Sequence, residues 1–289
     1  MNALLKIFLC LGTAGLVYAQ QPPPTDIYLL GMKFKKNNYL LTQPQNITAR
    51  AGYDNQPHFH PEKPLLYYSS AGNDGRTDIK VYNYKTGETR LLTQTAEREY
   101  SPTVTPDGKF ISCIIQRDNG AQDLGKYPID GGEPVVIINN LIVGYHAWIN
   151  EHQLLLFVLG EPNTLRLFDL RTGRDKIIAE NIGRSLHRIP GSNEMSFVEK
   201  RADAWYIRKY NPVNETITTL TSTLPGREDL TWTPDGKILM SNGERLFSIH
   251  PGRERVWKEL PASAAMSLKS ITRLAVNRKG NKLALVASE

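Results

Sequence analysis

The sequence predicts an all-β fold, a six-bladed β-propeller, from two repeating features. The first is the turn Thr-Pro-Asp-Gly-Lys, which occurs at residues 105–109 and again at 233–237. Proline presets φ at the first turn position, aspartate bonds its own local backbone, and glycine adopts positive φ without steric strain. Each copy follows an apolar residue (Val104, Trp232) and precedes a run of β-forming residues, so each is expected to join the two strands of a β-hairpin.

The second feature is an inward-facing apolar position that recurs at intervals of 41 to 45 residues. Six residues occupy this position: Phe59, Val104, Trp148, Ile189, Trp232 and Ala275. A second hairpin should follow in each repeat, with glycine-containing turns at 85–88, 130–133, 171–174 and 251–254. Four strands in about 43 residues is the size of a propeller blade. No segment has a sustained apolar period of 3.6 residues, so helices should be scarce.

Residues 1–19 have the pattern of a secretory signal peptide. Lys6 supplies the positive charge, residues 7–17 form a short apolar core, and Val17-Tyr18-Ala19 is a small-residue cleavage site. The apolar run is too short for a membrane span, and no second long apolar stretch follows it. We therefore expect an exported protein, periplasmic or secreted, in which residues 20–289 form a single propeller domain.

Residues 26–43 are expected to complete the last blade. Residues 25–43 match residues 77–94 in order, spacing and strand character, and the latter form the second half of the first repeat. The chain ends at Glu289, just after the second strand of the sixth repeat, so this repeat lacks its third and fourth strands. Placing residues 26–43 there closes the ring and pairs strand edges that would otherwise be exposed.

Composition and charge argue against several other classes of protein. The formal net charge of +6 is mild for 289 residues, and no run of Lys and Arg with interleaved aromatic residues marks a nucleic-acid groove. The densest basic spot, at residues 33–36, is explained by a solvated turn. After the signal peptide only Cys113 remains, so no disulfide can form within the chain. Ile111 and Ile115 flank it at the period of a strand, which indicates a buried core thiol.

Two segments carry a family resemblance. They are Ser101-Pro102-x-Val104-x-Pro106-Asp107-Gly108-Lys109 and Leu230-Thr231-Trp232-Thr233-Pro234-Asp235-Gly236-Lys237. They resemble the Pro-Asp repeat of TolB-like, WD40-like six-bladed β-propellers, and the resemblance covers residues 26–289. It implies an exported bacterial propeller that acts as an adaptor in the cell envelope. The resemblance does not extend to the α/β domain that precedes the propeller in full-length TolB, so the Tol–Pal role is not carried over.

Histidines are the most suggestive candidate site residues. Four of the six precede or begin the innermost strands, which line the channel of a propeller: His58, His60, His146 and His187. The resemblance implies a comparison with metal-dependent lyases on TolB-like propellers, which use channel-mouth histidines as ligands. A transition metal needs three or four N or O donors. The alternative is that each imidazole bonds a neighbouring carbonyl, and we favour it because the other blades have no histidine at the register of His146 and His187.

Acidic and tyrosine side chains gather just before the innermost strands. These are Asp54, Glu99, Glu228 and Asp229, with Tyr53, Tyr100 and Tyr145. They would rim one channel mouth, where tyrosine suits contact with protein or sugar; alternatively, the acids bond one blade to the next. The candidate channel-mouth contacts are His58, Tyr100, His146, His187 and Glu228. No catalytic, cofactor-binding or metal-binding residue is assigned.

The leading functional hypothesis is an exported, non-catalytic propeller that binds a protein or a cell-envelope component, with no cofactor. The only near match to a nucleophile elbow, at residues 183–187, lacks the second glycine. The alternative is a metal-dependent lyase or hydrolase that acts on a carbohydrate in the channel, with a transition metal as cofactor. Neither hypothesis involves nucleic acid or a membrane span, and the sequence does not indicate the oligomeric state.

Overall fold

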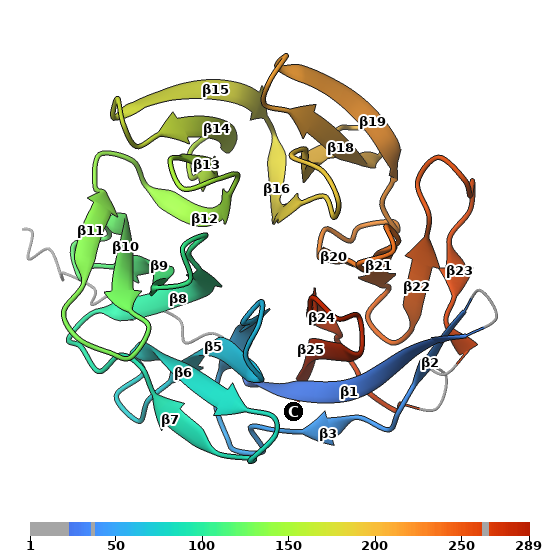
Figure 1. Ribbon diagram of the computed structural model, residues 1–289, viewed down its shortest axis with the longest axis horizontal. Coiled ribbons are helices and arrows are strands. Elements are labelled where there is room, and N and C mark those ends of the chain that lie inside the picture. The colour runs from blue at the N-terminus through green and yellow to red at the C-terminus, as the bar shows by residue number, and fades with distance from the viewer. Residues whose placement is uncertain (1–22, 36–37, 262–265) are drawn as a thin grey trace, which may run out of the picture.

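The computed structural model describes residues 23–35, 38–261 and 266–289. They form six small antiparallel sheets arranged as a ring around a central axis (Figure 1), which confirms the predicted six-bladed propeller. The described residues contain no α-helix, and hence none long and apolar enough to cross a membrane. The signal peptide predicted at residues 1–19 lies outside the described residues.

Five blades are contiguous in sequence, and in each the first strand lies nearest the axis. Blade 1 contains β4 (Asp54–Phe59), β5 (Leu65–Ala71), β6 (Thr77–Asn83) and β7 (Thr89–Leu91). Blade 2 contains β8 (Arg98–Val104), β9 (Phe110–Gln116), β10 (Gln122–Pro128) and β11 (Val135–Ile138). Blade 3 contains β12 (Val143–Trp148), β13 (Gln153–Val158), β14 (Thr164–Asp169) and β15 (Arg174–Glu180). Blade 4 contains β16 (Ile182–Arg188), β17 (Met195–Lys200), β18 (Trp205–Asn211) and β19 (Thr216–Ser222). Blade 5 contains β20 (Leu230–Trp232), β21 (Ile238–Ser241), β22 (Leu246–Ile249) and β23 (Lys258–Glu259).

Blade 6 is assembled from both ends of the chain, as the sequence predicts. Its inner strands are β24 (Thr272–Val276) and β25 (Lys282–Ser288), and its outer strands are β1 (Thr25–Lys35) and β2 (Asn38–Leu41). β1 pairs antiparallel with β25 from Thr25 opposite Ser288 to Gly31 opposite Lys282. The short strand β3 (Gln45–Asn46) also pairs with β1. The first and last described strands are therefore neighbours in one sheet.

The repeated Thr-Pro-Asp-Gly-Lys turn joins the first and second strands of blades 2 and 5. In blade 2, Asp107 accepts hydrogen bonds from the Thr105 hydroxyl at 2.6 Å and from the Lys109 amide at 3.1 Å. Gly108 has φ of 68°, a conformation that glycine adopts without the strain of a Cβ atom. The turn therefore fixes the hairpin that follows each channel-lining strand.

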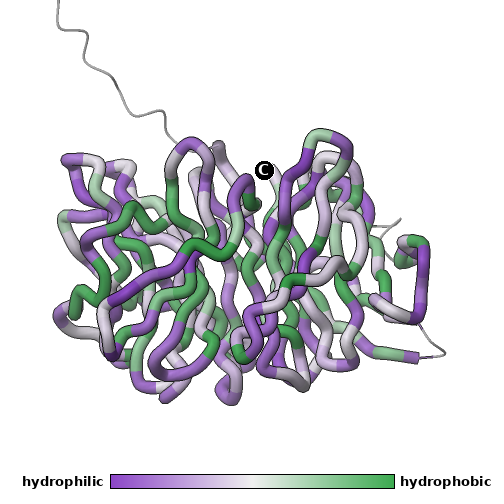
Figure 2. Tube along the Cα trace, turned by 90° about the horizontal axis from the view of Figure 1, so that it is seen from above, coloured by the Kyte–Doolittle hydropathy of each residue, from purple (hydrophilic) through white to green (hydrophobic). Residues whose placement is uncertain are grey.

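The hydrophobic core consists of layers between adjacent blades. For example, Tyr67 and Ile79 of blade 1 pack against Ile111 and Cys113 of blade 2, and all four are fully buried. Seen edge-on, hydrophilic residues concentrate at the loops of the two faces (Figure 2). Burial raises the pKa of the Cys113 thiol well above its usual value, as expected for an inert core cysteine.

Two tryptophans at the recurrent apolar position also bond the blades together. The Trp148 indole donates to the Ser112 hydroxyl at 2.8 Å, and the Trp232 indole donates to the Ser196 hydroxyl at 2.8 Å. Each serine lies on the second strand of the preceding blade. A buried indole N–H needs such a partner, so the recurrent position contributes both apolar packing and inter-blade hydrogen bonds.

Closure of the ring by β1 predicts a large difference between two leucines of blade 6. Leu30 on β1 is fully buried between blades 5 and 6, whereas Leu40 on β2 is 51% exposed. Leu30→Ala should lower the free energy of unfolding by about 2 to 5 kcal/mol, and Leu40→Ala by no more than about 0.5 kcal/mol. Urea denaturation measures both. Equal, small effects would show that β1 is not part of the folded core.

Candidate functional site

A central cavity of about 770 Å³ runs between the innermost strands of the six blades. Five of the six recurrent apolar residues line it: Phe59, Val104, Trp148, Trp232 and Ala275. One mouth is bordered by exposed residues of the turns that follow the innermost strands, including Glu62, Pro106 and Arg278. The other end is lined by residues where the innermost strands begin, and these residues bond to one another across the axis.

An arginine and a tyrosine meet across the cavity at this second end. Arg273 of blade 6 donates from Nη2 to the Tyr145 hydroxyl of blade 3 at 2.7 Å, and its guanidinium lies 4.8 Å from the centre of the tyrosine ring. Blades 3 and 6 are opposite each other in the ring (Figure 1). The pair therefore narrows this end of the channel with a combined hydrogen bond and cation–π contact.

Asp229 links Arg273 to a third blade. The Arg184 guanidinium of blade 4 donates to both oxygens of Asp229, at 2.9 and 2.6 Å, and Arg273 lies 3.6 Å from the same carboxylate. Burial opposes ionisation of Asp229, yet the two arginines lower its pKa below the usual range. Burial alone would lower the pKa of Arg184, but Asp229 raises it. A charged network thus joins blades 4, 5 and 6 at this narrowed second end of the cavity, which we call the closed end.

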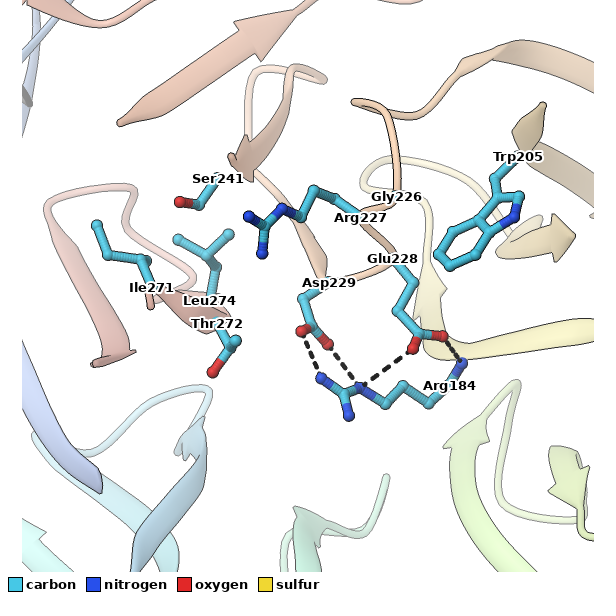
Figure 3. A pocket seen from close by; sticks show the side chains of 10 residues that line it. All are labelled: Arg184, Trp205, Gly226, Arg227, Glu228, Asp229, Ser241, Ile271, Thr272 and Leu274. Atoms are coloured by element: carbon cyan, nitrogen blue, oxygen red, sulfur yellow. Dashed lines mark hydrogen bonds and ion pairs between the residues drawn. The ribbon is translucent and has the colours of Figure 1, made fainter. Parts of the chain in front are cut away.

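Glu228 lies beside this network and lines a separate pocket of about 120 Å³ (Figure 3). It accepts a hydrogen bond from the Arg184 amide at 2.9 Å and pairs with Lys200 at 3.1 Å. A Cβ atom on Gly183 would stand 2.6 Å from Glu228, so glycine is required for this close approach. Glu228 therefore fastens blade 5 to blade 4 and does not line the central cavity.

The other two acids of the predicted rim, Asp54 and Glu99, are buried within the protein, and one oxygen of Asp54 has no hydrogen-bond partner among the described residues. Asp54 is fully buried and pairs with Arg50 at 2.9 Å. Glu99 is also fully buried and accepts hydrogen bonds from the Thr95 and Tyr127 hydroxyls, while burial raises its pKa. β4 and β8 begin early enough to place Asp54 and Glu99 inside the sheets, so neither lines the central cavity.

The tyrosines of the predicted rim differ in whether they line the central cavity. Tyr145 lines the central cavity, whereas Tyr100 does not. The Tyr100 ring packs edge-on against Tyr53, 6.5 Å between centres, and against the apolar layer between blades 2 and 3. Whether Tyr100 and Glu228 contact a partner remains a prediction, but they cannot act from within the cavity.

Three of the five predicted contacts, His58, His146 and His187, do line the cavity. His146 is 7% exposed, and its Nε2 lies 2.7 Å from the Ser112 hydroxyl. That hydroxyl donates its single proton to the Thr103 carbonyl, so the proton of the His146 contact must sit on Nε2. Nδ1 of His146 is then an acceptor, and it is buried without a partner in the described protein.

In His60, also on the cavity wall, the acceptor nitrogen is bonded and the donor nitrogen is the one without a partner. Its Nδ1 accepts hydrogen bonds from the amides of Glu62 and Lys63, both at 3.0 Å, so Nε2 carries the proton. The side chain is 6% exposed, and Nε2 has no partner among the described residues. The Ser101 hydroxyl, which also lines the cavity, is a third buried polar group without a hydrogen-bond partner among the described residues.

Burial keeps the channel histidines neutral near pH 7. It lowers the pKa of His58 to about 4, of His146 to about 3 and of His187 to about 4. His60 and His187 lower the pKa of His58 further, and His58 lowers the pKa of His146, because a second positive charge nearby is unfavourable. The middle of the cavity is therefore polar but carries no histidine charge.

Backbone strain also gathers around the cavity. Gln56, Ser101 and Arg273 are lining residues with left-handed backbone, at φ of 58°, 56° and 38°. Each lies where the innermost strand of its blade shifts register. Non-glycine residues adopt this conformation only when the surrounding structure holds them there, and such positions cluster at binding sites.

The residues that sequence analysis missed are the arginines of the closed end. Neither Arg184 nor Arg273 belongs to a motif that would single it out in the sequence. No group of three or more His, Cys, Asp or Glu within the described ranges is placed to hold a metal ion. The four histidines on the cavity wall, His58, His60, His146 and His187, are not grouped in this way.

Comparison with solved structures identifies the architecture. A putative TolB from Agrobacterium tumefaciens superimposes with a TM-score of 0.69 at 12% identity, over 91% of this chain and 98% of that one. TolB from Acinetobacter baumannii gives a TM-score of 0.56 at 14% identity, over 92% of this chain and 64% of the longer TolB chain. The fold is that of the TolB-like propellers. No protein-family model matches the sequence, and neither does a curated protein.

A third similar structure is an enzyme. An oligogalacturonate lyase in complex with manganese superimposes with a TM-score of 0.55 at 14% identity, over 87% of this chain and 83% of the lyase. At such identities the likeness concerns the fold, which hosts both binding proteins and enzymes.

The depressed histidine pKa values predict a defined pH dependence. Below about pH 6.5 an unfolded histidine binds a proton that the folded one does not, so the free energy of unfolding falls as the pH drops towards 4. His146→Gln removes one such group and should reduce this fall by up to about 2 kcal/mol between pH 7 and pH 5. Urea denaturation at several pH values measures it, with the exposed His152→Gln as control. Parallel pH curves for all three proteins would contradict the prediction.

The closed end predicts that Asp229 stabilises the ring. Asp229→Asn leaves two arginines with a neutral partner at a largely buried site and should lower the free energy of unfolding by about 2 to 3 kcal/mol. Asp118, which also pairs with two arginines but has a 66% exposed side chain, is a matched control. Asp118→Asn should have a much smaller effect because solvent screens exposed pairs. The same loss in both variants would contradict a special role for the network.

Proposed function

We propose that this protein is an exported, non-catalytic β-propeller that binds a protein or another cell-envelope component through the open mouth of its central cavity. The observation that carries the proposal is the set of buried polar groups without protein partners on the cavity wall. They are a bare acceptor, His146 Nδ1, a bare donor, His60 Nε2, and the Ser101 hydroxyl.

These groups match the chemistry of an extended polypeptide segment. A buried polar group without a partner costs about 1 to 3 kcal/mol, which a ligand recovers if it supplies the missing hydrogen bond. A peptide backbone offers both N–H donors and C=O acceptors at each residue. The neutral imidazoles impose no requirement for a charged ligand, and Phe59, Trp148 and Trp232 provide apolar surface between the polar groups.

The asymmetry of the channel determines how a partner would approach. At one end Arg273, Tyr145, Arg184 and Asp229 bond across the axis and narrow the passage. At the other end, turns of several blades present exposed side chains around the mouth. A partner that inserts a segment there can also contact these turns, which suits an adaptor in the envelope.

A photo-crosslinking experiment tests the approach. A photoreactive amino acid at Glu62, on the rim of the open mouth, should capture a discrete partner from the envelope fraction. The same residue at Val213, which is 85% exposed on the turn after β18, serves as control and should capture none. Adducts from Val213 alone would contradict binding at the mouth.

Ser101→Ala tests the cavity itself. The Ser101 hydroxyl has no partner among the described residues, so its removal should not lower the free energy of unfolding, while it should weaken capture at Glu62 several-fold. Full capture by this variant would show that the partner does not enter the cavity.

The alternative function, a metal-dependent lyase or hydrolase acting on a carbohydrate, is favoured by one observation, the four histidines on the cavity wall. Metal analysis of protein purified without chelator distinguishes it. A stoichiometric transition metal that is lost in His146→Ala and His187→Ala variants would favour the enzyme and contradict the non-catalytic proposal.

A further inference from the structure

The positive charge of this chain is concentrated in one blade. Between Asp26 and Asp54, and again between Glu259 and Glu289, the sequence contains no Asp or Glu. These two segments supply the strands of blade 6, and together they hold nine of the 35 Lys and Arg residues, against a formal net charge of +6 for the whole chain. Blade 6 is therefore the source of most of the charge excess.

Four lysines of blade 6 lie on β1, at the start of β25 and in the turn between β24 and β25, and the β1–β2 hairpin itself projects beside β23 at the edge of the ring (Figure 1). Lys33 and Lys35 lie on β1 beyond the end of its pairing with β25, and Lys282 begins β25 opposite Gly31. The Met32 amide donates to the Asn281 carbonyl at 2.9 Å, which places the turn that carries Lys279 directly against the hairpin. We call Lys33, Lys35, Lys279 and Lys282 the basic tip.

These lysines are not neutralised by the protein. Within the described ranges none of the four has an ion pair, and three of them are exposed while Lys282 is half-buried. Arg278, in the same turn as Lys279, approaches only Glu62, at 3.8 Å and with both side chains more than two thirds exposed. The basic tip therefore presents several unpaired cations within one small area.

Two large apolar side chains are exposed among these cations. Phe34, between Lys33 and Lys35, is 46% exposed, and Leu40, paired with Lys33 across the hairpin, is 51% exposed. Alternation along the strands puts Lys33, Lys35 and Leu40 on one face of the hairpin and Phe34 on the other. Phe34 lies on the face that packs toward blade 5, where its ring centre is 5.1 Å from that of Tyr39 and 5.2 Å from Lys237 Nζ, and the rest of the ring remains exposed. Leu40 and the two lysines of β1 lie on the opposite face.

We propose that the basic tip docks the propeller on the surface of an anionic lipid bilayer, with Phe34 and Leu40 in the headgroup layer. Each lysine near an anionic membrane raises the affinity of the protein for that membrane by about fivefold. The aliphatic part of the side chain lets the ammonium group remain among the lipid phosphates. Aromatic and aliphatic side chains beside them gain from leaving water. The surface is distinct from the central cavity, so this inference does not depend on the proposed function.

A bilayer fits this geometry better than an acidic protein does. A folded protein would need a surface shaped to this narrow tip in order to reach both Leu40 and the exposed part of Phe34. A fluid headgroup layer adapts to the shape of the tip and supplies phosphates to all four lysines.

Vesicle co-sedimentation of the full-length protein tests this proposal. Phosphatidylcholine vesicles with about one third phosphatidylglycerol should bind the protein at low salt, and pure phosphatidylcholine vesicles should not, because the attraction is electrostatic. Reversing three charges with Lys33→Glu, Lys35→Glu and Lys282→Glu should weaken binding by at least about a hundredfold. Leu40→Ser should weaken the binding that survives in high salt.

The matched control reverses three exposed lysines elsewhere, with Lys63→Glu, Lys85→Glu and Lys109→Glu. It changes the net charge by the same amount but leaves the basic tip intact, so most of the binding should remain. All variants keep the same N-terminal segment, so any contribution from residues 1–19 is common to them. Equal losses in the two triple variants, equal binding to both kinds of vesicle, or binding only to a soluble polyanion such as heparin would overturn the proposal.

Discussion

The antiparallel pairing of β1 with β25 is the contact on which the rest of the ring depends. Each blade buries both faces of its sheet, one against each neighbour, so the core between blades is complete only in a closed ring. Leu30 of β1 packs with Leu239 and Leu246 of blade 5, and Ile27 of the same strand packs with Leu66 and Tyr68 of blade 1. β1, from the beginning of the chain, thus contributes apolar side chains to both interfaces of the last blade, the one with blade 5 and the one with blade 1.

Because the apolar layers lie between blades, the centre of the ring need not be apolar. Its inner strands carry neutral imidazoles, hydroxyls and two indoles whose N–H groups bond backward to serines of the preceding blade. The charged groups collect at one end, where Asp229 and two arginines compensate each other. This division gives the cavity an uncharged interior and two chemically different ends, and it is the physical basis for binding from one side.

The fold was predictable because its signals are local. The spacing of Val104, Trp148 and Trp232, and the chemistry of the turns that follow two of them, depend only on nearby residues. The placement of His146 and His187 in the channel also followed from strand alternation.

The closed end could not be predicted in the same way. Tyr145 and Arg273 are 128 residues apart, and Arg273 reaches the axis only because a register shift and a left-handed backbone redirect it. One extra residue in a strand moves a side chain to another direction, and no composition pattern specifies where it occurs. Glu228, two residues before β20, pairs with Lys200 of blade 4 and does not line the channel, a long-range contact that no local pattern specifies.

The bond between Arg273 and Tyr145 crosses the axis of the ring and joins two opposite blades. A blade has a diametric partner only in a ring with an even number of blades. Duplication or loss of a single repeat is the simplest genetic change open to a tandem array, and it would give a ring of seven or five in which blade 6 faces a gap between blades. The Arg273–Tyr145 contact therefore disfavours the gain or loss of a single repeat, independently of how the blades pack against one another.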